Sequence, residues 1–205
     1  ESDVCLGLLR RYPGGDAGGT RLITLLGPPG VGKTRLAIDL ANRAAELYPD
    51  GVFWLSLAST EEAELFGELL ATRLNITREQ TTRPLDDLAT QLHNRRCLLV
   101  LDNLEHLLHK SEEVRLAISA LLQRTQALSV LATSQSPLGI TGEQVFPIRP
   151  LQTPHLARLP APAELEKNPA VRLFVRCASA LKPGFELNDG NALAVASICA
   201  HLDGL

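Results

Sequence analysis

The feature that most constrains the fold of this chain is an apolar run, RLITLL at 21–26, that leads directly into the segment GPPGVGKT at 27–34. The run has the composition of a buried parallel strand, and apolar residues recur at helical spacing from Lys33 to about Tyr48. The glycines and prolines between them indicate a tight turn. A strand, a tight turn and an amphipathic helix in this order predict an α/β fold with a loop at the carboxyl end of a buried strand.

The turn also matches the pattern G-x-x-x-x-G-K-[S/T] at every fixed position. Glycines let the main chain wrap closely around phosphate oxygens, and the following helix presents its positive end to the same phosphates. In this arrangement Lys33 reaches the β- and γ-phosphates, and the Thr34 hydroxyl binds Mg²⁺. The flanking strand and helix argue against the alternative of a chance glycine-rich turn. We therefore predict that ATP or ADP binds with Mg²⁺ at Gly27, Pro28, Pro29, Gly30, Val31, Gly32, Lys33, Thr34 and Arg35.

Up to residue 150, apolar strands alternate with amphipathic helices. Such alternation implies right-handed crossovers, a parallel sheet and helices on both of its faces. Together with the loop, it predicts an α/β fold of the P-loop NTPase type, with three α/β/α layers around a parallel five-stranded sheet. The predicted strands lie at 21–26, 52–57, 97–101, 129–133 and 145–148, and the predicted helices at 1–12, 33–48, 61–74, 84–92 and 110–123.

The composition changes after Pro150. Residues 152–167 contain three prolines, which is typical of a linker. Two helices follow, one opening at Asn168-Pro169, a favourable cap and first-turn pair, and one from about Asp189. The second helix is expected to turn inward Leu193, Ala196, Ile198, Cys199 and Leu202. The expected parts are an N-terminal flank at 1–20, a nucleotide-binding domain at 21–151, a linker at 152–167 and a helical subdomain at 168–205.

Asp102 ends the predicted strand CLLVL. An acid at the carboxyl end of a buried parallel strand points into the crevice where ligands bind in such sheets. We predict that Asp102 is the second anchor for Mg²⁺ beside Thr34, acting through a water molecule. The alternative is that Asp102 only caps the helix after the strand.

Hydrolysis needs groups besides Lys33 and Asp102, because water must be oriented and charge on the γ-phosphate must be stabilised. Asn103 and Glu105 follow Asp102 closely. Asn103 is therefore a candidate for positioning water, and Glu105 a candidate for the base that takes its proton. The alternative for both is that they cap the next helix or face solvent.

A polar run, Thr133-Ser134-Gln135, follows the fourth predicted strand. Its position at a carboxyl end places it beside the γ-phosphate, where Ser134 or Gln135 is a candidate sensor of that phosphate; the alternative is an ordinary turn. His106 and His109 are expected at the surface of a helix start, because no third metal ligand accompanies them.

Composition narrows the functional class. The net charge of −3 argues against nucleic-acid binding by bulk electrostatics, and no apolar run approaches the ~20 residues of a membrane span. The four cysteines are far apart and lack metal-ligand spacing, which favours buried thiols in a reducing, cytoplasmic setting. Because the chain contains no methionine and ends within a helical pattern, we expect it to be a piece of a longer protein.

Four runs together resemble the signal-transduction ATPases with numerous domains (STAND), specifically the AP-ATPase or NB-ARC type of bacterial regulators. They are RLITLLGPPGVGKTRLA, CLLVLDNLEHLL, VLATSQSPLGITGEQVFPIRPL and NPAVRLFVRCASAL with ASICAHLDGL. The first run alone indicates only a P-loop NTPase, whereas LDNLEH and ATSQSPL with the later GE make the resemblance specific.

The resemblance implies an ATP/ADP-controlled switch with slow hydrolysis in a multidomain regulator. Such proteins often carry a DNA-binding domain, of LuxR or related type, and helical sensor repeats, and they often form homo-oligomers on activation. Residues 168–205 then correspond to the start of a helical lid over the nucleotide.

Two departures from that family stand out. Members commonly carry Arg after the Thr-Ser pair as a γ-phosphate sensor, where this chain has Gln135, which supplies no positive charge. Their lids also carry Gly-Leu-Pro-Leu, whose proline packs on adenine, whereas this sequence stops at Gly204-Leu205. The alternatives are an AAA+-type motor ATPase and a module in which the nucleotide is purely structural.

Overall fold

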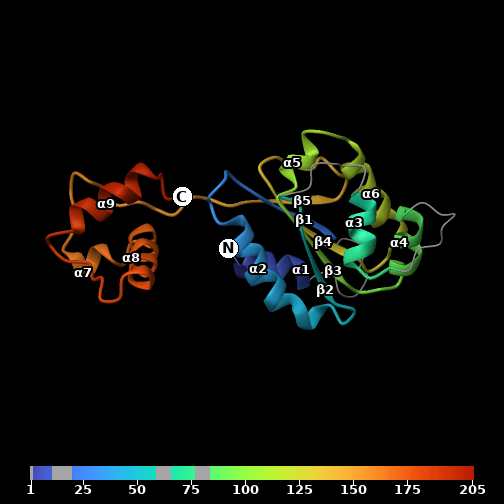
Figure 1. Cartoon of the computed structure of the whole chain (residues 1–205), viewed down its shortest axis with the longest axis horizontal. Coiled ribbons are helices and arrows are strands. Elements are labelled where there is room, and N and C mark those ends of the chain that lie inside the picture. The colour runs from blue at the N-terminus through green and yellow to red at the C-terminus, as the bar shows by residue number, and fades with distance from the viewer. Residues whose placement is uncertain (1, 11–19, 59–65, 77–83) are drawn as a thin grey trace. The chain divides into compact units, whose positions relative to one another are not determined.

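The computed structural model describes residues 2–10, 20–58, 66–76 and 84–205 (Figure 1). The first residues of the helix predicted at 61–74 lie outside these ranges. The chain divides into two compact units. The larger comprises residues 1–28 and 33–148, and the smaller comprises 149–205 with the loop residues 29–32.

The larger unit is built on a five-stranded sheet whose pairings are all parallel. The strand order is β2-β3-β4-β1-β5. Because paired strands are parallel, each connection has to return the chain to the opposite end of the sheet. This confirms the predicted P-loop NTPase fold with its parallel five-stranded sheet. The strands are β1 (Leu22–Leu26), β2 (Val52–Ser56), β3 (Leu98–Asp102), β4 (Ser129–Ser134) and β5 (Glu143–Pro147).

Helices cover both faces of this sheet, with α1 and α2 on one side and α3, α4 and α6 on the other (Figure 1). Helix α2 ends in a short 3₁₀ turn, η1 (Ala45–Leu47). The short helix α5 follows β3 at the edge of the sheet. The bounds are α1 (Ser2–Arg10), α2 (Lys33–Ala44), α3 (Phe66–Arg73), α4 (Pro84–Leu92), α5 (Glu105–Leu108) and α6 (Glu113–Arg124).

Side-chain alternation along the strands supplies a core on each face of the sheet. On the side of α3, α4 and α6, Leu99 and Leu101 of β3 pack with fully buried helix residues such as Phe66 and Leu88. Complete burial of a Leu or Phe side chain stabilises the fold by about 1.5–3 kcal/mol. On the other side α2 contacts β1, β3 and β4. Its buried residues include Ala37, Ala41 and Ala44, whose small side chains allow close packing on the sheet.

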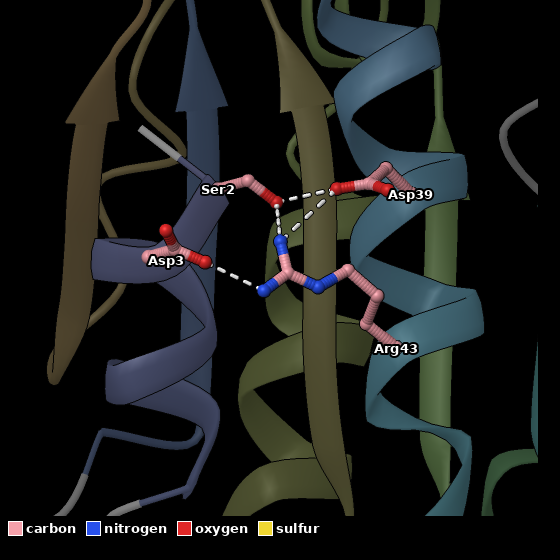
Figure 2. Close-up of polar contacts among 4 residues, drawn as sticks. All are labelled: Ser2, Asp3, Asp39 and Arg43. Carbon is pink, nitrogen blue, oxygen red and sulfur yellow. Dashed lines mark hydrogen bonds and ion pairs between the residues drawn. The ribbon is translucent and has the colours of Figure 1, made fainter.

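Helix α1 packs on α2, and Figure 2 shows the polar contacts at the margin of this interface. Arg43 donates to Ser2 Oγ at 2.7 Å and pairs with Asp3 at 2.5 Å and Asp39 at 3.5 Å, while Ser2 also bonds Asp39. These side chains are partly or largely exposed, so solvent screens the ion pairs and they add little to stability. The buried apolar face of α1, which includes Leu9 at 1% exposure, therefore holds the helix in place.

The smaller unit is helical. It contains α7 (Pro162–Leu165), α8 (Pro169–Leu181) and α9 (Ala192–His201). The predicted cap is confirmed, because Asn168 Oδ1 accepts from the N–H groups of Ala170 at 3.1 Å and Val171 at 3.3 Å. Residues 152–167, expected to be a linker, include α7, whose Leu165 is 1% exposed and belongs to the core of this unit.

The inward face expected for α9 is partly wrong. Leu193, Ile198 and Leu202 are 61%, 43% and 54% exposed. The buried stripe is instead Ala192, Val195, Ala196 and Cys199. This stripe has i, i+3, i+4, i+7 spacing, so one helical face is buried. The prediction gave more weight to large apolar side chains than to helical spacing, whereas the helix buries its smaller residues.

Gly204 provides a test of packing in the smaller unit. Its φ is 74°, and a Cβ there would lie 1.9 Å from the carbonyl oxygen of Leu151, whose N–H donates to the Gly204 oxygen at 2.9 Å. Gly184 has a similar φ of 85°, but a Cβ there meets nothing within 4 Å. We expect Gly184→Ala to cost about 1–2 kcal/mol from backbone strain alone, and Gly204→Ala up to about 3 kcal/mol more from steric overlap. Urea unfolding followed by circular dichroism compares the two, and equal losses would contradict the steric argument.

The cysteines are all free thiols. Cys5, Cys97 and Cys199 are buried as expected, and burial raises the pKa of the Cys97 thiol to about 11. Cys177 is exposed, contrary to expectation, because it lies on the outer side of α8. Within the described ranges, no group of three metal-binding side chains is present, and no helix has the length and apolar character to cross a bilayer.

Candidate functional site

The candidate site lies at the edge of the sheet where β1, β3 and β4 end. Parallel pairing brings their carboxyl ends together, with Leu26 of β1 opposite Ser134 of β4. The pairing continues one step beyond the strand, because the Gly27 N–H donates to the Ser134 carbonyl at 3.3 Å. The predicted phosphate loop therefore begins against the end of β4.

The main chain of the loop requires glycine at two positions. Gly30 and Gly32 have φ values of 81° and 100°, a region that residues with a side chain rarely adopt. Pro28, Pro29, Gly30 and Gly32 are exposed, and Val31 is half-buried. The loop thus presents accessible main chain, as close approach to a ligand would require.

Lys33 is the first residue of α2 and is only 6% exposed. Its Nζ donates to the carbonyl oxygens of Gly27 at 2.8 Å and Pro28 at 3.1 Å. Both partners are neutral, and among the described residues no carboxylate pairs with this ammonium group. A buried charge with neutral partners is costly unless an opposite charge approaches it, so this position suits an anionic ligand. Arg35 is exposed, and its side chain makes no hydrogen bond to the part of the chain that the structure describes.

Three residues distant in sequence meet at one carboxylate oxygen. Asp102 Oδ1 accepts from Thr34 Oγ1 at 2.9 Å and from Thr133 Oγ1 at 2.6 Å. Asp102 is 4% exposed and Thr133 is fully buried. A hydroxyl and a carboxylate are the oxygen ligands that Mg²⁺ prefers, so Thr34 and Asp102 fit that ion. Thr133 fixes the carboxylate from the other side, a role that the sequence did not indicate.

The turn after β3 is held by the same threonine. The Asn103 N–H donates to Thr133 Oγ1 at 2.9 Å, and the Leu104 N–H donates to the Thr133 carbonyl at 3.1 Å. Asn103 has a φ of 61°, which Asn tolerates better than most residues. Leu104 occupies the N-cap position of α5, without a side-chain cap. The Asn103 side chain therefore does not cap this helix.

Glu105, the first residue of α5, is 6% exposed and therefore does not face solvent. Its Oε1 accepts from Gln135 Nε2 at 3.1 Å. Its Oε2 is buried and has no hydrogen-bond partner within the described residues. Ser134 is buried, and His106 and His109 are exposed as expected.

Glu143 has a structural role that the sequence reasoning did not assign. Its two carboxylate oxygens accept from the N–H groups of Leu138 at 2.9 Å and Gly139 at 2.8 Å. It thereby closes the loop that leads from Gln135 to β5. The sequence signalled this residue only as part of the GE pair in the run that resembles the family.

Sequence comparison gives a family for this architecture. A family model described as an AAA domain matches residues 16–139. A protein of Mycobacterium tuberculosis (strain H37Rv) named "Putative HTH-type transcriptional regulator" is 37% identical over 185 residues, which is 90% of this chain and 19% of that protein. An uncharacterized protein of the same strain is 30% identical over 185 residues, covering 90% of this chain and 43% of that protein. The chain thus spans less than half of either relative.

Solved structures share the fold at low sequence identity. Cdc6p from Pyrobaculum aerophilum aligns with a TM-score of 0.57 and 16% identity, over 97% of this chain and 54% of that one. A STAND protein with a tetratricopeptide repeat sensor from Pyrococcus horikoshii aligns with a TM-score of 0.54 and 15% identity, over 98% of this chain and 28% of that one. These similarities agree with the P-loop NTPase fold described above.

Proposed function

This chain belongs to the AAA domain family, and we propose that it binds ATP or ADP with Mg²⁺ and acts as a nucleotide-controlled switch in a larger regulator. The observation that carries the proposal is the meeting of Lys33, Thr34 and Asp102 at one sheet edge. Lys33 supplies an uncompensated buried charge, and the other two supply oxygen ligands. A magnesium-bound polyphosphate satisfies both requirements at once.

In this proposal the glycine-rich loop and Lys33 hold the β- and γ-phosphates. Thr34 and Asp102 would hold Mg²⁺, which would supply positive charge against that of the phosphates. The hydrogen bond between Thr34 and Asp102 keeps both oxygen ligands together at the sheet edge.

We further propose that hydrolysis is slow. Glu105 is the candidate base, since it is buried at the correct edge of the sheet, and Asn103 is a candidate for positioning water. Gln135 is neutral, so it gives the γ-phosphate no positive charge, whereas an arginine that contacts the γ-phosphate accelerates phosphoryl transfer by about 10³–10⁵. Slow turnover suits a switch, whose state must persist long enough to be read.

The STAND, AP-ATPase or NB-ARC subtype is the finer part of the proposal. Support comes from the runs LDNLEH and ATSQSPL, from a relative named as an HTH-type regulator, and from the fold shared with a STAND protein. In this view the whole protein carries a DNA-binding domain, of LuxR or related type, and sensor repeats. Residues 168–205 act as part of a lid, and activation involves homo-oligomers.

The rate of ATP hydrolysis distinguishes the switch from a motor-type ATPase. We expect saturating binding of ATP and ADP by calorimetry, and hydrolysis on the order of 10⁻³ s⁻¹ or slower, as in P-loop proteins without an added arginine. Phosphate release in single-turnover experiments measures this rate. Turnover of about 1 s⁻¹ or faster would instead indicate a motor-type ATPase.

Hydrogen exchange distinguishes the switch from a module in which the nucleotide is purely structural. A switch changes amide protection in α8 and α9 between the ADP and ATP complexes, whereas a structural nucleotide leaves it the same. Identical protection in the two complexes would therefore contradict the switch.

A further inference from the structure

Glu105 and Gln135 form a pair that the proposed nucleotide site does not explain. The Glu105 side chain is more than nine-tenths buried, yet only Oε1 is hydrogen-bonded, to Gln135 Nε2 at 3.1 Å. Oε2 is equally buried and lacks a partner among the described residues. A buried carboxylate oxygen without a donor is unfavourable, so it marks a position where a donor is missing.

Hydrogen bonds at the sheet edge hold the main chain next to both residues of this pair. On one side, Thr133 holds the turn at Asn103 and Leu104, directly before Glu105. On the other side, the residue before Gln135 is Ser134, whose carbonyl accepts from Gly27, the first residue of the phosphate loop. The pair therefore bridges the turn after β3 and the strand end that contacts the loop.

The chemistry of glutamine explains why one oxygen stays free. An amide NH₂ group on a flexible side chain donates to one carboxylate oxygen here, whereas a guanidinium has the forked geometry to cover both. Gln135 thus fixes the Glu105 carboxylate through Oε1 and leaves the buried Oε2 without a donor.

We propose that Gln135 is a positioning residue that acts through Glu105, holding its carboxylate so that Oε2 accepts the proton of the water that attacks the γ-phosphate. This inference rests on the proposed function, since it requires ATP in the site. It differs from a direct sensor role, in which the Gln135 amide contacts the γ-phosphate itself.

The proposed step is balanced. The water oxygen forms a bond to the γ-phosphorus, and the bond from that phosphorus to the β–γ bridging oxygen breaks, with its electron pair leaving on ADP. The water proton passes to Glu105 Oε2 and is then released to phosphate or solvent.

The test is a double-mutant cycle of Gln135→Ala and Glu105→Gln in the full chain, with kcat from single-turnover phosphate release and affinities from calorimetry. We expect Glu105→Gln to lower kcat by about 100-fold or more, as for loss of a general base. Gln135→Ala should lower kcat about tenfold, the size of one hydrogen bond to a charged group. ATP and ADP affinities should stay within about twofold in both variants, and Gln135→Ala should have no further effect in the Glu105→Gln background.

Gln135→Arg gives an independent arm. If Gln135 acts through Glu105, the forked arginine side chain should cover both carboxylate oxygens, so kcat should fall although a donor is retained and ADP affinity should not change. A rise in kcat would instead show that a side chain at this position reaches the γ-phosphate, as in the direct sensor role. Urea unfolding of every variant checks that folding is kept.

Three results would overturn the positioning role. The first is a kcat of the double variant that falls by the product of the two single losses. The second is weakened ATP affinity in Gln135→Ala with kcat unchanged, which indicates direct contact with phosphate. The third is a chain that binds ATP without ever hydrolysing it. In all three cases the unaltered chain still binds nucleotide, whereas failure of the proposed function appears as absence of binding by the unaltered chain.

Discussion

Replacing Lys33 with alanine should severely weaken or abolish binding of both ATP and ADP. The Lys33 ammonium is buried and has only the carbonyls of Gly27 and Pro28 as partners, so in our proposal phosphate is its sole compensating charge. Removing one side of a buried, hydrogen-bonded charge pair costs about 2–5 kcal/mol, which corresponds to a ~30- to ~3,000-fold loss of affinity. Isothermal titration calorimetry with each nucleotide measures the loss.

A matched control separates the site from general charge effects. Lys167 is an exposed lysine that pairs with Glu164 at the surface. Lys167→Ala removes the same charge and should leave both affinities unchanged. The Lys33→Ala variant should also unfold at no lower urea concentration, because it removes a buried charge that lacks an acidic partner. Undiminished ATP affinity in Lys33→Ala would refute the assignment of the loop.

The parts of the fold that follow from local pattern were predictable from sequence. Residues 21–48 show a clear apolar pattern for a strand and for a helix, with a glycine-rich turn between them. The parallel sheet follows from the alternation of strands and helices. Asp102 was identified because chain direction alone puts the last residue of a buried parallel strand at the ligand edge. These inferences need only neighbours along the chain.

The parts that depend on tertiary contacts were not predictable. Nothing local reveals that Thr133 bridges Asp102 and Asn103, or that Glu143 closes the loop between Gln135 and β5. Likewise, Gln135 looked like a possible phosphate sensor, and only the structure pairs it with Glu105.

The prediction of the buried face of α9 was wrong for a related reason. Packing in the smaller unit buries the smaller side chains of this helix, although Leu193 and Ile198 are more hydrophobic.

Asp102→Ala should weaken nucleotide binding strongly when Mg²⁺ is present and little when it is absent. In our proposal Asp102 acts on the nucleotide only through the metal, and loss of such an anchor typically costs about 10- to 100-fold in metal affinity. Without Mg²⁺, the Asp102 carboxylate repels the phosphates, so its removal should leave affinity equal or slightly higher. Calorimetry with ATP in magnesium buffer and in EDTA gives the two affinities.

The same variant also removes a hydrogen-bond acceptor from Thr34 and Thr133, so loss of structure has to be distinguished from loss of metal binding. Asp102→Asn makes the distinction, because an amide oxygen still accepts hydrogen bonds while the negative charge is gone. If charge toward Mg²⁺ is what matters, the alanine and asparagine variants should lose magnesium-dependent affinity to a similar degree and keep magnesium-free affinity. Equal losses in both buffers would mean that Asp102 shapes the loop and does not hold the metal, because a metal ligand has no means of acting once the metal has been removed.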